Sequence, residues 1–144
     1  MAEGIFIHSH NEVSDRFSIL DETDEVAFFY ITKKGTQEPE KDAIAYMRVT
    51  PEDNVDWKEM AESGRPPVLS SELASPNAVL LNANEGLFGF EWSADGNSVA
   101  LHYNNEPIAL VSAQKEIGYS KAVAKDNSLT NAWSQALYNG LFNR

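Results

Sequence analysis

Cysteine is absent from the 144-residue sequence. Structural disulfides, thiolate metal sites, CxxC redox motifs and cysteine nucleophiles are therefore excluded. The chain also lacks any apolar run near the roughly 20 residues that a membrane-spanning helix needs. No signal-peptide hydrophobic region follows Met1. We therefore expect a cytoplasmic protein that does not insert into a membrane.

Positive charge is scarce. Eleven Lys and Arg residues face 22 Asp and Glu residues, which gives a net charge of −11. Binding to a phosphate backbone requires clustered positive charge, so nucleic acids are excluded as partners, and anionic membrane surfaces are disfavoured. Residues 1–62 hold 15 of the 22 acids and 6 of the 11 bases. This negative field would attract a cationic partner, although a surface that only keeps the protein soluble carries the same charge.

The remaining composition is typical of a folded domain. Hydrophobic residues make up 42% of the chain and charged residues 23%. The least regular stretch, Gly64 to Asn84, is too short to separate two cores and is interpreted as a loop. We therefore expect a single domain over residues 1–144.

Strand patterns dominate the first third of the chain. Phe17 and Ile19 alternate with polar neighbours, the acidic run Asp21–Glu25 resembles a turn, and Val26–Thr32 is rich in aromatic and β-branched residues. These features predict a hairpin. A further strand is expected over Ala43–Val49.

A short helix is expected in the middle of the chain. Thr50 is a suitable N-cap, Pro51 suits the first helical position, and Gly64 supplies the end. The buried stripe of this helix is expected to contain Trp57, Met60 and Ala61.

A second helix is expected near the C-terminus, with Asn127 or Ser128 as its cap and its end at about Gly140. Apolar residues recur there every four positions and define one face. These residues are Leu129, Trp133, Leu137 and Leu141.

The segment 86–113 predicts a three-stranded meander. Asp95-Gly96 favours a type I′ hairpin, whose two central residues both need positive φ. A second turn is expected at Asn104–Pro107. With the first turn at Asp95-Gly96, the predicted cross-strand pairs are Trp92 with Val99, Phe90 with Leu101 and Phe88 with Tyr103. Strands followed by a closing helix indicate an α+β fold: an antiparallel sheet with a short middle helix and a C-terminal helix packed on it.

His102 lies on the polar side of this meander. The predicted register places it opposite Gly89 and diagonally beside Glu91. A carboxylate beside a histidine fixes the tautomer of the ring, so the pair could perform acid–base chemistry. Sheet surfaces also carry such pairs with no chemistry attached, and we favour that interpretation.

His8 and His10 share one face if their segment is extended. Such pairs occur in zinc and iron sites, but a third ligand would be needed, with Glu12 or His102 as candidates. A solvent-facing strand end explains the pair better. We expect no metal and no cofactor.

Protein recognition is the function that the pattern favours. Aromatic residues beside an acidic run suit a protein-binding face, and Phe28, Phe29 and Tyr30 cannot all lie on one side of a strand. A sheet buried on both sides would accommodate the same aromatics. The expected binding residues are Asp21, Glu22, Asp24 and Glu25 as steering charges, with Phe29 or Tyr30 as an anchor.

Several landmarks resemble those of a small bacterial domain family of unknown function. They are Asp24–Tyr30, Asp42-Ala43-Ile44, Trp92-Ser93-x-Asp95-Gly96, Gly118-Tyr119 and Trp133. The family has no established activity, so the resemblance implies a fold and no catalytic residues.

The sequence therefore predicts a non-enzymatic acidic domain that binds a basic protein, in the manner of an immunity or inhibitor protein. An alternative is a small-molecule-binding or hydrolytic domain that uses His102 and Glu91 in a pocket between sheet and helix. No nucleophile elbow, phosphate-binding loop, dinucleotide fingerprint or HExxH motif supports an enzyme.

Overall fold

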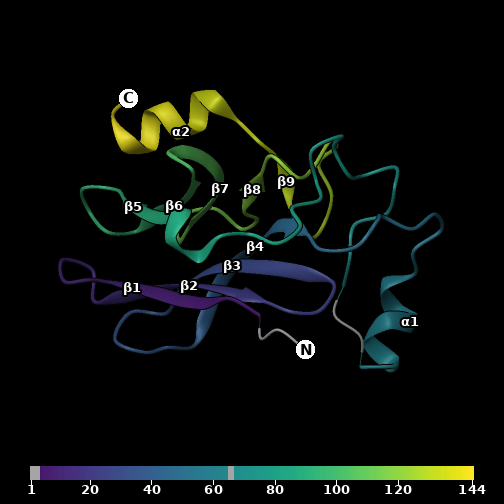
Figure 1. Ribbon diagram of the computed structural model, residues 1–144. Coiled ribbons are helices and arrows are strands. Elements are labelled where there is room, and N and C mark those ends of the chain that lie inside the picture. The colour runs from purple at the N-terminus through teal and green to yellow at the C-terminus, as the bar shows by residue number, and fades with distance from the viewer. Residues whose placement is uncertain (1–3, 65–66) are drawn as a thin grey trace.

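The computed structural model describes residues 4–64 and 67–144, whose strands form two stacked sheets (Figure 1). The first sheet is antiparallel, and its strands in order are β1 (Phe6–Asn11), β2 (Arg16–Glu22), β3 (Val26–Thr32) and β4 (Pro39–Met47). The second sheet contains β5 (Phe88–Trp92), β6 (Ser98–Tyr103), β7 (Glu106–Ser112), β8 (Tyr119–Ser120) and β9 (Asn131–Ala132). Its strands are antiparallel except that β8 and β9 pair in parallel.

The helices are short. They are α1 (Trp57–Glu62), the 3₁₀ helix η1 (Glu85–Leu87) and α2 (Gln135–Phe142). The α+β class predicted from the sequence is confirmed, with the strands divided between two sheets. In the described residues, no helix is long and apolar enough to cross a membrane.

The main core lies between the two sheets. Alternate residues of the strands face inward because side chains of a strand point to opposite sides of the sheet. The buried members of this core are Leu20, Ala27, Phe29, Ile31, Ala43, Ala45, Tyr46, Val99, Leu101, Ala109 and Val111. The two sheets thus bury a common apolar layer.

Helix α2 covers the outer side of the five-stranded sheet (Figure 1). Tyr138 and Phe142 on the helix pack with Ala100 and Leu110 of the sheet. A third cluster joins one end of β3 and β4 to the segment 49–80, with Val26, Ile44 and Met47 packing against Met60 and Leu69 among others.

The predicted register of the β5–β6 hairpin is confirmed. Its pairs are Phe88 with Tyr103, Phe90 with Leu101 and Trp92 with Val99. The turn type is wrong, however, because Gly96 has a positive φ of 72° whereas Asp95 does not. The Asp95 carboxylate accepts hydrogen bonds from Ser93 Oγ at 2.7 Å and from the Asn97 amide at 3.0 Å. These bonds favour a longer turn that Asp95 itself organises.

A two-residue turn of the predicted kind occurs at the next connection. Asn104 and Asn105 have φ values of 52° and 67°, and they join the paired residues Tyr103 and Glu106. Asparagine tolerates this left-handed conformation better than most residues.

The middle helix begins later than predicted. Asp56, not Thr50, caps it by accepting hydrogen bonds from the amides of Lys58 and Glu59 at 3.0 and 3.2 Å. Asn54 has a φ of 55°, which no helical residue adopts. The preceding residues are extended, because Glu52 bridges Ser70. The predicted end holds: Ser63 is the C-cap, and Gly64 follows it with a φ of 76°.

Part of the stripe predicted for this helix is also wrong. Met60 is buried and Trp57 is partly buried, but Ala61 is exposed. With the helix starting at Trp57 there is room for little more than one buried position.

The C-terminal helix likewise begins at Gln135, capped by Ser134, rather than at Asn127 or Ser128. Asn131 donates its amide to the carbonyl of Gly118 at 2.8 Å, so this stretch forms β9 instead of a helical turn. The shifted start moves Leu129 and Trp133 out of the helix. Tyr138 and Phe142 become its buried residues.

Candidate functional site

The face of the four-stranded sheet that points away from the core is called here the outer face. The register aligns its residues in rows across β1 to β4. Its members are Phe6, His8 and His10 of β1, Phe17, Ile19 and Asp21 of β2, Phe28 and Tyr30 of β3, and Asp42 and Ile44 of β4. Among the described residues, no helix covers β1 and β2 on this side, whereas α2 covers the other sheet (Figure 1).

Aromatic rings lie together on the outer face. The Phe17 ring lies 4.6 Å from the His10 ring and 6.2 Å from the His8 ring, measured between centroids. Phe6 is 58% exposed at the outer margin of the same sheet. Exposed apolar groups that gather on one face are typical of interaction surfaces.

Carboxylates flank the ring of Tyr30, which lies on the same face. Tyr30 pairs with Ile19 on one side and with exposed Asp42 on the other. Burial raises the pKa of the Tyr30 hydroxyl, and the negative charge of Asp21 raises it further. Tyr30 therefore presents a neutral, partly buried ring between two acidic side chains.

The two residues named from the sequence as candidate anchors lie on opposite sides of the sheet. Phe29 is 0% exposed and lies in the core between the sheets. Tyr30 points to the outer face. Both sheet faces are thus used, as the consecutive aromatics required, and Tyr30 is the accessible residue of the pair.

The four predicted steering charges are not equivalent. Asp24 is exposed in the β2–β3 turn, Glu25 follows it, and Asp21 is partly exposed on the outer face. Glu22 points inward instead, with a side chain only 4% exposed. Its carboxylate accepts hydrogen bonds from the Ile5 amide at 2.9 Å and from the Tyr46 hydroxyl.

Glu22 therefore supports the fold. Arg48 Nε lies 3.7 Å from Glu22 Oε1 and supplies the opposite charge. Burial, followed by the hydrogen bond to Glu22, raises the pKa of the Tyr46 hydroxyl. A buried carboxylate with these partners is not available to steer a ligand.

The structure brings His102 and Glu91 together, as the register predicted. His102 Nε2 lies 2.7 Å from Glu91 Oε1. The same carboxylate accepts hydrogen bonds from the Tyr138 hydroxyl at 2.6 Å and from Arg144 Nε at 2.9 Å. Burial acts to raise the pKa of Glu91, but the bonds from Tyr138, Arg144 and His102 outweigh it and lower the pKa.

This cluster clamps α2 to the sheet. Three side chains already occupy the carboxylate, so Glu91 has little capacity left to take up a substrate proton. The hollows described below are lined by other residues. The geometry therefore favours a structural role for the pair.

His8 and His10 point to the same side of β1, as expected for an extended segment. His10 Nε2 lies 3.0 Å from Asp15 Oδ1. In residues 4–64 and 67–144, no group of three or more His, Cys, Asp or Glu side chains could hold a metal ion.

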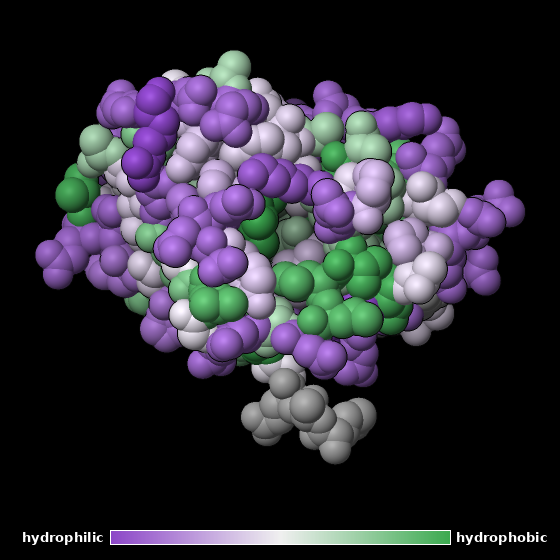
Figure 2. Space-filling model, turned by 45° about the horizontal axis from the view of Figure 1, so that its top comes forward, coloured by the Kyte–Doolittle hydropathy of each residue, from purple (hydrophilic) through white to green (hydrophobic). Residues whose placement is uncertain are grey.

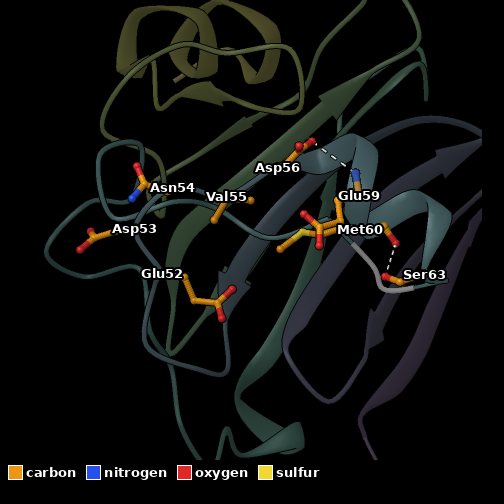
Figure 3. Close-up of a pocket in the computed structure, with 8 residues that line it drawn as sticks. All are labelled: Glu52, Asp53, Asn54, Val55, Asp56, Glu59, Met60 and Ser63. Atoms are coloured by element: carbon orange, nitrogen blue, oxygen red, sulfur yellow. Dashed lines mark hydrogen bonds between the residues drawn. The ribbon is translucent and has the colours of Figure 1, made fainter.

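An acidic hollow of about 240 Å³ lies beside α1 (Figure 3). Its carboxylates come from Glu52, Asp53, Asp56 and Glu59. Figure 3 shows Asp53 pointing away from Glu59, while Asp56 faces the amide of Glu59 as the helix cap. The carboxylates do not converge on one point.

A second hollow, of about 310 Å³, is lined mainly by apolar and aromatic residues, including Tyr46, Leu80, Tyr103 and Ile108. The hydroxyl of Tyr103 accepts a hydrogen bond from the Asn84 amide at 3.0 Å. Figure 2 shows hydrophobic side chains gathered in one patch, surrounded by hydrophilic surface. The segment 79–87, which contributes Leu80 to the lining of this hollow, also carries the exposed hydrophobic residues Val79, Leu81 and Leu87.

Sequence reasoning missed two members of the outer face and two of the clamp. Phe6 and Asp42 join the outer face through pairing with β2 and β3, and the alternation of β1 was the available signal. Tyr138 reaches Glu91 from α2, and Arg144 reaches it from the chain end just after that helix. Sequence patterns carry no signal for that contact.

Comparison with known proteins adds no further assignment to this geometry. No family model matches the chain, and neither a curated protein nor a solved structure is significantly similar to it.

Proposed function

We propose that this chain is a protein-binding domain that recognises a basic partner through the outer face of the four-stranded sheet. The observation that carries the proposal is the part of the outer face over β1 and β2 that no helix covers. There Phe6 and Phe17 lie near Asp21, and the partly exposed Tyr30 and exposed Asp42 continue the surface onto β3 and β4. Aromatic side chains dominate the binding energy of many protein interfaces. They also attract Arg and Lys cations through their ring faces.

The charge distribution supports a basic partner. The net charge is −11, and 15 of the 22 acids fall in residues 1–62, the part of the chain that builds this sheet. A negative field accelerates the encounter with a positively charged surface, and the rate falls as salt screens the field. An inhibitor or immunity protein that blocks a basic enzyme or toxin would have this design.

Site-specific photo-crosslinking tests the proposal. A benzoylphenylalanine probe replaces Phe17 on the outer face, and a control probe replaces exposed Ala136 on α2. We expect the Phe17 probe to capture a protein with a basic isoelectric point from the native lysate, with less adduct at high salt. The control probe is expected to capture much less of it. Equal capture at both positions, or adducts with acidic proteins only, would overturn the proposal.

Two charge variants then separate steering from fold damage. Asp21→Asn combined with Asp42→Asn should slow association with the captured partner severalfold and flatten its salt dependence. Glu116→Gln is the control, because Glu116 is exposed in the loop after β7. Glu22 is left unchanged because its carboxylate is buried. Unchanged association kinetics for the double variant would remove the electrostatic part of the proposal.

The bacterial family resemblance and the cytoplasmic location stay predictions. The exclusion of nucleic acid as a partner also rests on the charge balance alone.

A further inference from the structure

Strand β1 has an open edge. The Glu22 amide donates to the Ile5 carbonyl at 2.9 Å, which fixes the alternation of the β1–β2 hydrogen bonds. Hydrogen-bonded pairs recur at every second residue of an antiparallel ladder, so Ile7 is also hydrogen-bonded to its partner Leu20. The backbone groups of Phe6, His8 and His10 therefore point away from β2. No described residue pairs with that side of β1.

The opposite edge of the same sheet is closed. On β4, the Ile44 amide donates to Thr130 Oγ1 at 2.9 Å, and the Met47 amide donates to the Ala78 carbonyl at 2.7 Å. Segments outside the sheet thus accept hydrogen bonds from these two backbone amides of β4, which point away from β3. Within residues 4–64 and 67–144, the fold protects one edge and leaves the other available.

Strand β1 also lacks the devices that keep an open edge from pairing. Natural edge strands are protected by Lys, Pro, charged side chains or bulges. Residues 4–11 contain no Lys, Arg, Asp, Glu or Pro, and the β1–β2 register runs from Phe6 to Asn11 without a shift. In a chain with a net charge of −11, this strand carries no carboxylate, so two copies that meet edge to edge place no acidic side chain of β1 opposite another.

We propose that a second copy of this chain occupies the β1 edge, so that two four-stranded sheets join into one continuous sheet. The two β1 strands would run antiparallel, with a two-fold axis at His8. His8 then faces His8 of the other copy, and Phe6 faces His10 of the other copy. Each outward residue exchanges two backbone hydrogen bonds with its opposite residue. The pairing is self-complementary, as a two-fold dimer requires.

The position of the five-stranded sheet is compatible with pairing of two β1 strands. Trp92 Nε1 donates to Ser9 Oγ at 3.0 Å, which ties β5 to β1. Strand β5 is itself the edge of its sheet. The open edges of both layers therefore lie on the same side of the molecule. This inference does not depend on the proposed function.

Cysteine crosslinking provides the first test, because the natural chain contains no cysteine. In the proposed dimer the two His8 Cα atoms lie about 5.5 Å apart, a separation that a disulfide spans. We expect His8→Cys to form a covalent dimer rapidly under mild oxidation. The control is Val13→Cys, which is 73% exposed but lies beyond the strand. Equal crosslinking of both variants would overturn the proposal.

Sedimentation and amide hydrogen exchange provide the second test. The natural chain should sediment as a dimer of the 16.0 kDa chain, with slow exchange at Phe6, His8 and His10. His8→Pro removes only outward-pointing amides, one from each copy, and should weaken dimerisation by about 10- to 100-fold. His8→Ala keeps the amide and should remain dimeric.

Two results would overturn the proposal. One is a monomer at all accessible concentrations, with fast exchange at those three amides. The other is protection that arises only when a different protein is added, because the strand would then belong to a heterologous partner. Far-UV circular dichroism confirms that His8→Pro is folded, and the crosslinking result stands even if it is not.

Discussion

The hydroxyl of Tyr138 donates a hydrogen bond of 2.6 Å to Oε1 of Glu91, across the boundary between α2 and the five-stranded sheet. The bond joins residues 47 positions apart in the sequence. It places a phenol from the helix on a carboxylate that His102 and Arg144 also contact. The position of α2 is therefore fixed by polar contacts as well as by apolar packing.

Tyr138→Phe should reduce the free energy of unfolding by about 1.5–3 kcal/mol, the usual range for a hydrogen bond to a charged group. Urea titration followed by tryptophan fluorescence measures the change. Tyr119→Phe is the control, since Tyr119 packs in the same apolar cluster and its hydroxyl has no hydrogen-bond partner among the described residues. If both variants lose the same stability, the Glu91 bond is not the cause.

Glu91 should make stability depend on acid pH. Burial acts to raise the pKa of its carboxyl, but the bonds from Tyr138, Arg144 and His102 hold the pKa below its ordinary value of 4.5. As the pH falls, the unfolded state takes up the proton first. The contribution of Glu91 is therefore complete above the ordinary pKa and is lost as the pH falls through the folded-state value.

The measurement is urea unfolding of the natural chain and of Glu91→Gln from about pH 6 to about pH 3. The difference in stability between them should shrink toward low pH. Glu116→Gln, an exposed acid elsewhere, should give a curve parallel to that of the natural chain. A constant difference between the natural chain and Glu91→Gln would contradict the lowered pKa.

Gly118→Ala should destabilise the fold by overpacking. A Cβ at this position would lie 2.7 Å from Ala43 Cβ, 2.7 Å from the Asp42 carbonyl and 2.9 Å from Val111 Cγ1. Such crowding costs about 1–3 kcal/mol, measured as a lower urea midpoint. Gly89→Ala is the matched control, because nothing lies within 4 Å of its added Cβ. The control should be neutral or slightly stabilising, since glycine weakens a strand interior.

Two substitutions of Asn105, in the Asn104-Asn105 turn, should change the thermal midpoint in different ways. Asn105 has a φ of 67°. Asn105→Ala should lower the thermal midpoint, because the left-handed conformation costs most residues about 1–2 kcal/mol and alanine lacks the short polar side chain that lets asparagine tolerate it. Asn105→Gly should leave the midpoint unchanged or raise it. Equal losses for both would show that the asparagine side chain, rather than the backbone, stabilises the turn.

The β5–β6 register could be predicted because the apolar residues of both strands alternate with period two about a single turn. Phe90 and Leu101 had to meet if the hydrophobic side of each strand faced the core. The type of turn could not be predicted. It depends on the hydrogen bonds that the Asp95 side chain makes within the loop.

The helix starts were mispredicted for a tertiary reason. Thr50 and Pro51 have suitable local propensities, but the bridge between Glu52 and Ser70 keeps that stretch extended. Pairing of β9 with β8 has the same effect on residues before Gln135. Local capping patterns do not report a distant strand that competes for the same backbone groups.

The candidate sites show the same contrast between what a local pattern predicts and what depends on tertiary packing. Glu91 and His102 are neighbours across one hairpin, so the register sufficed to predict their contact. The separation of Phe29 from Tyr30 also followed from alternation. Which of the two is buried depended on where the second sheet packs.

Each sheet is built from an uninterrupted stretch of chain. The strands before α1 form one layer, and the strands after η1 form the other. Pairing within a layer closes short loops and is therefore entropically inexpensive. Docking of the layers brings together residues far apart in the sequence and should limit the folding rate. A chain divided after Gly64 would carry one complete sheet in each fragment, and the two fragments should reassemble on mixing.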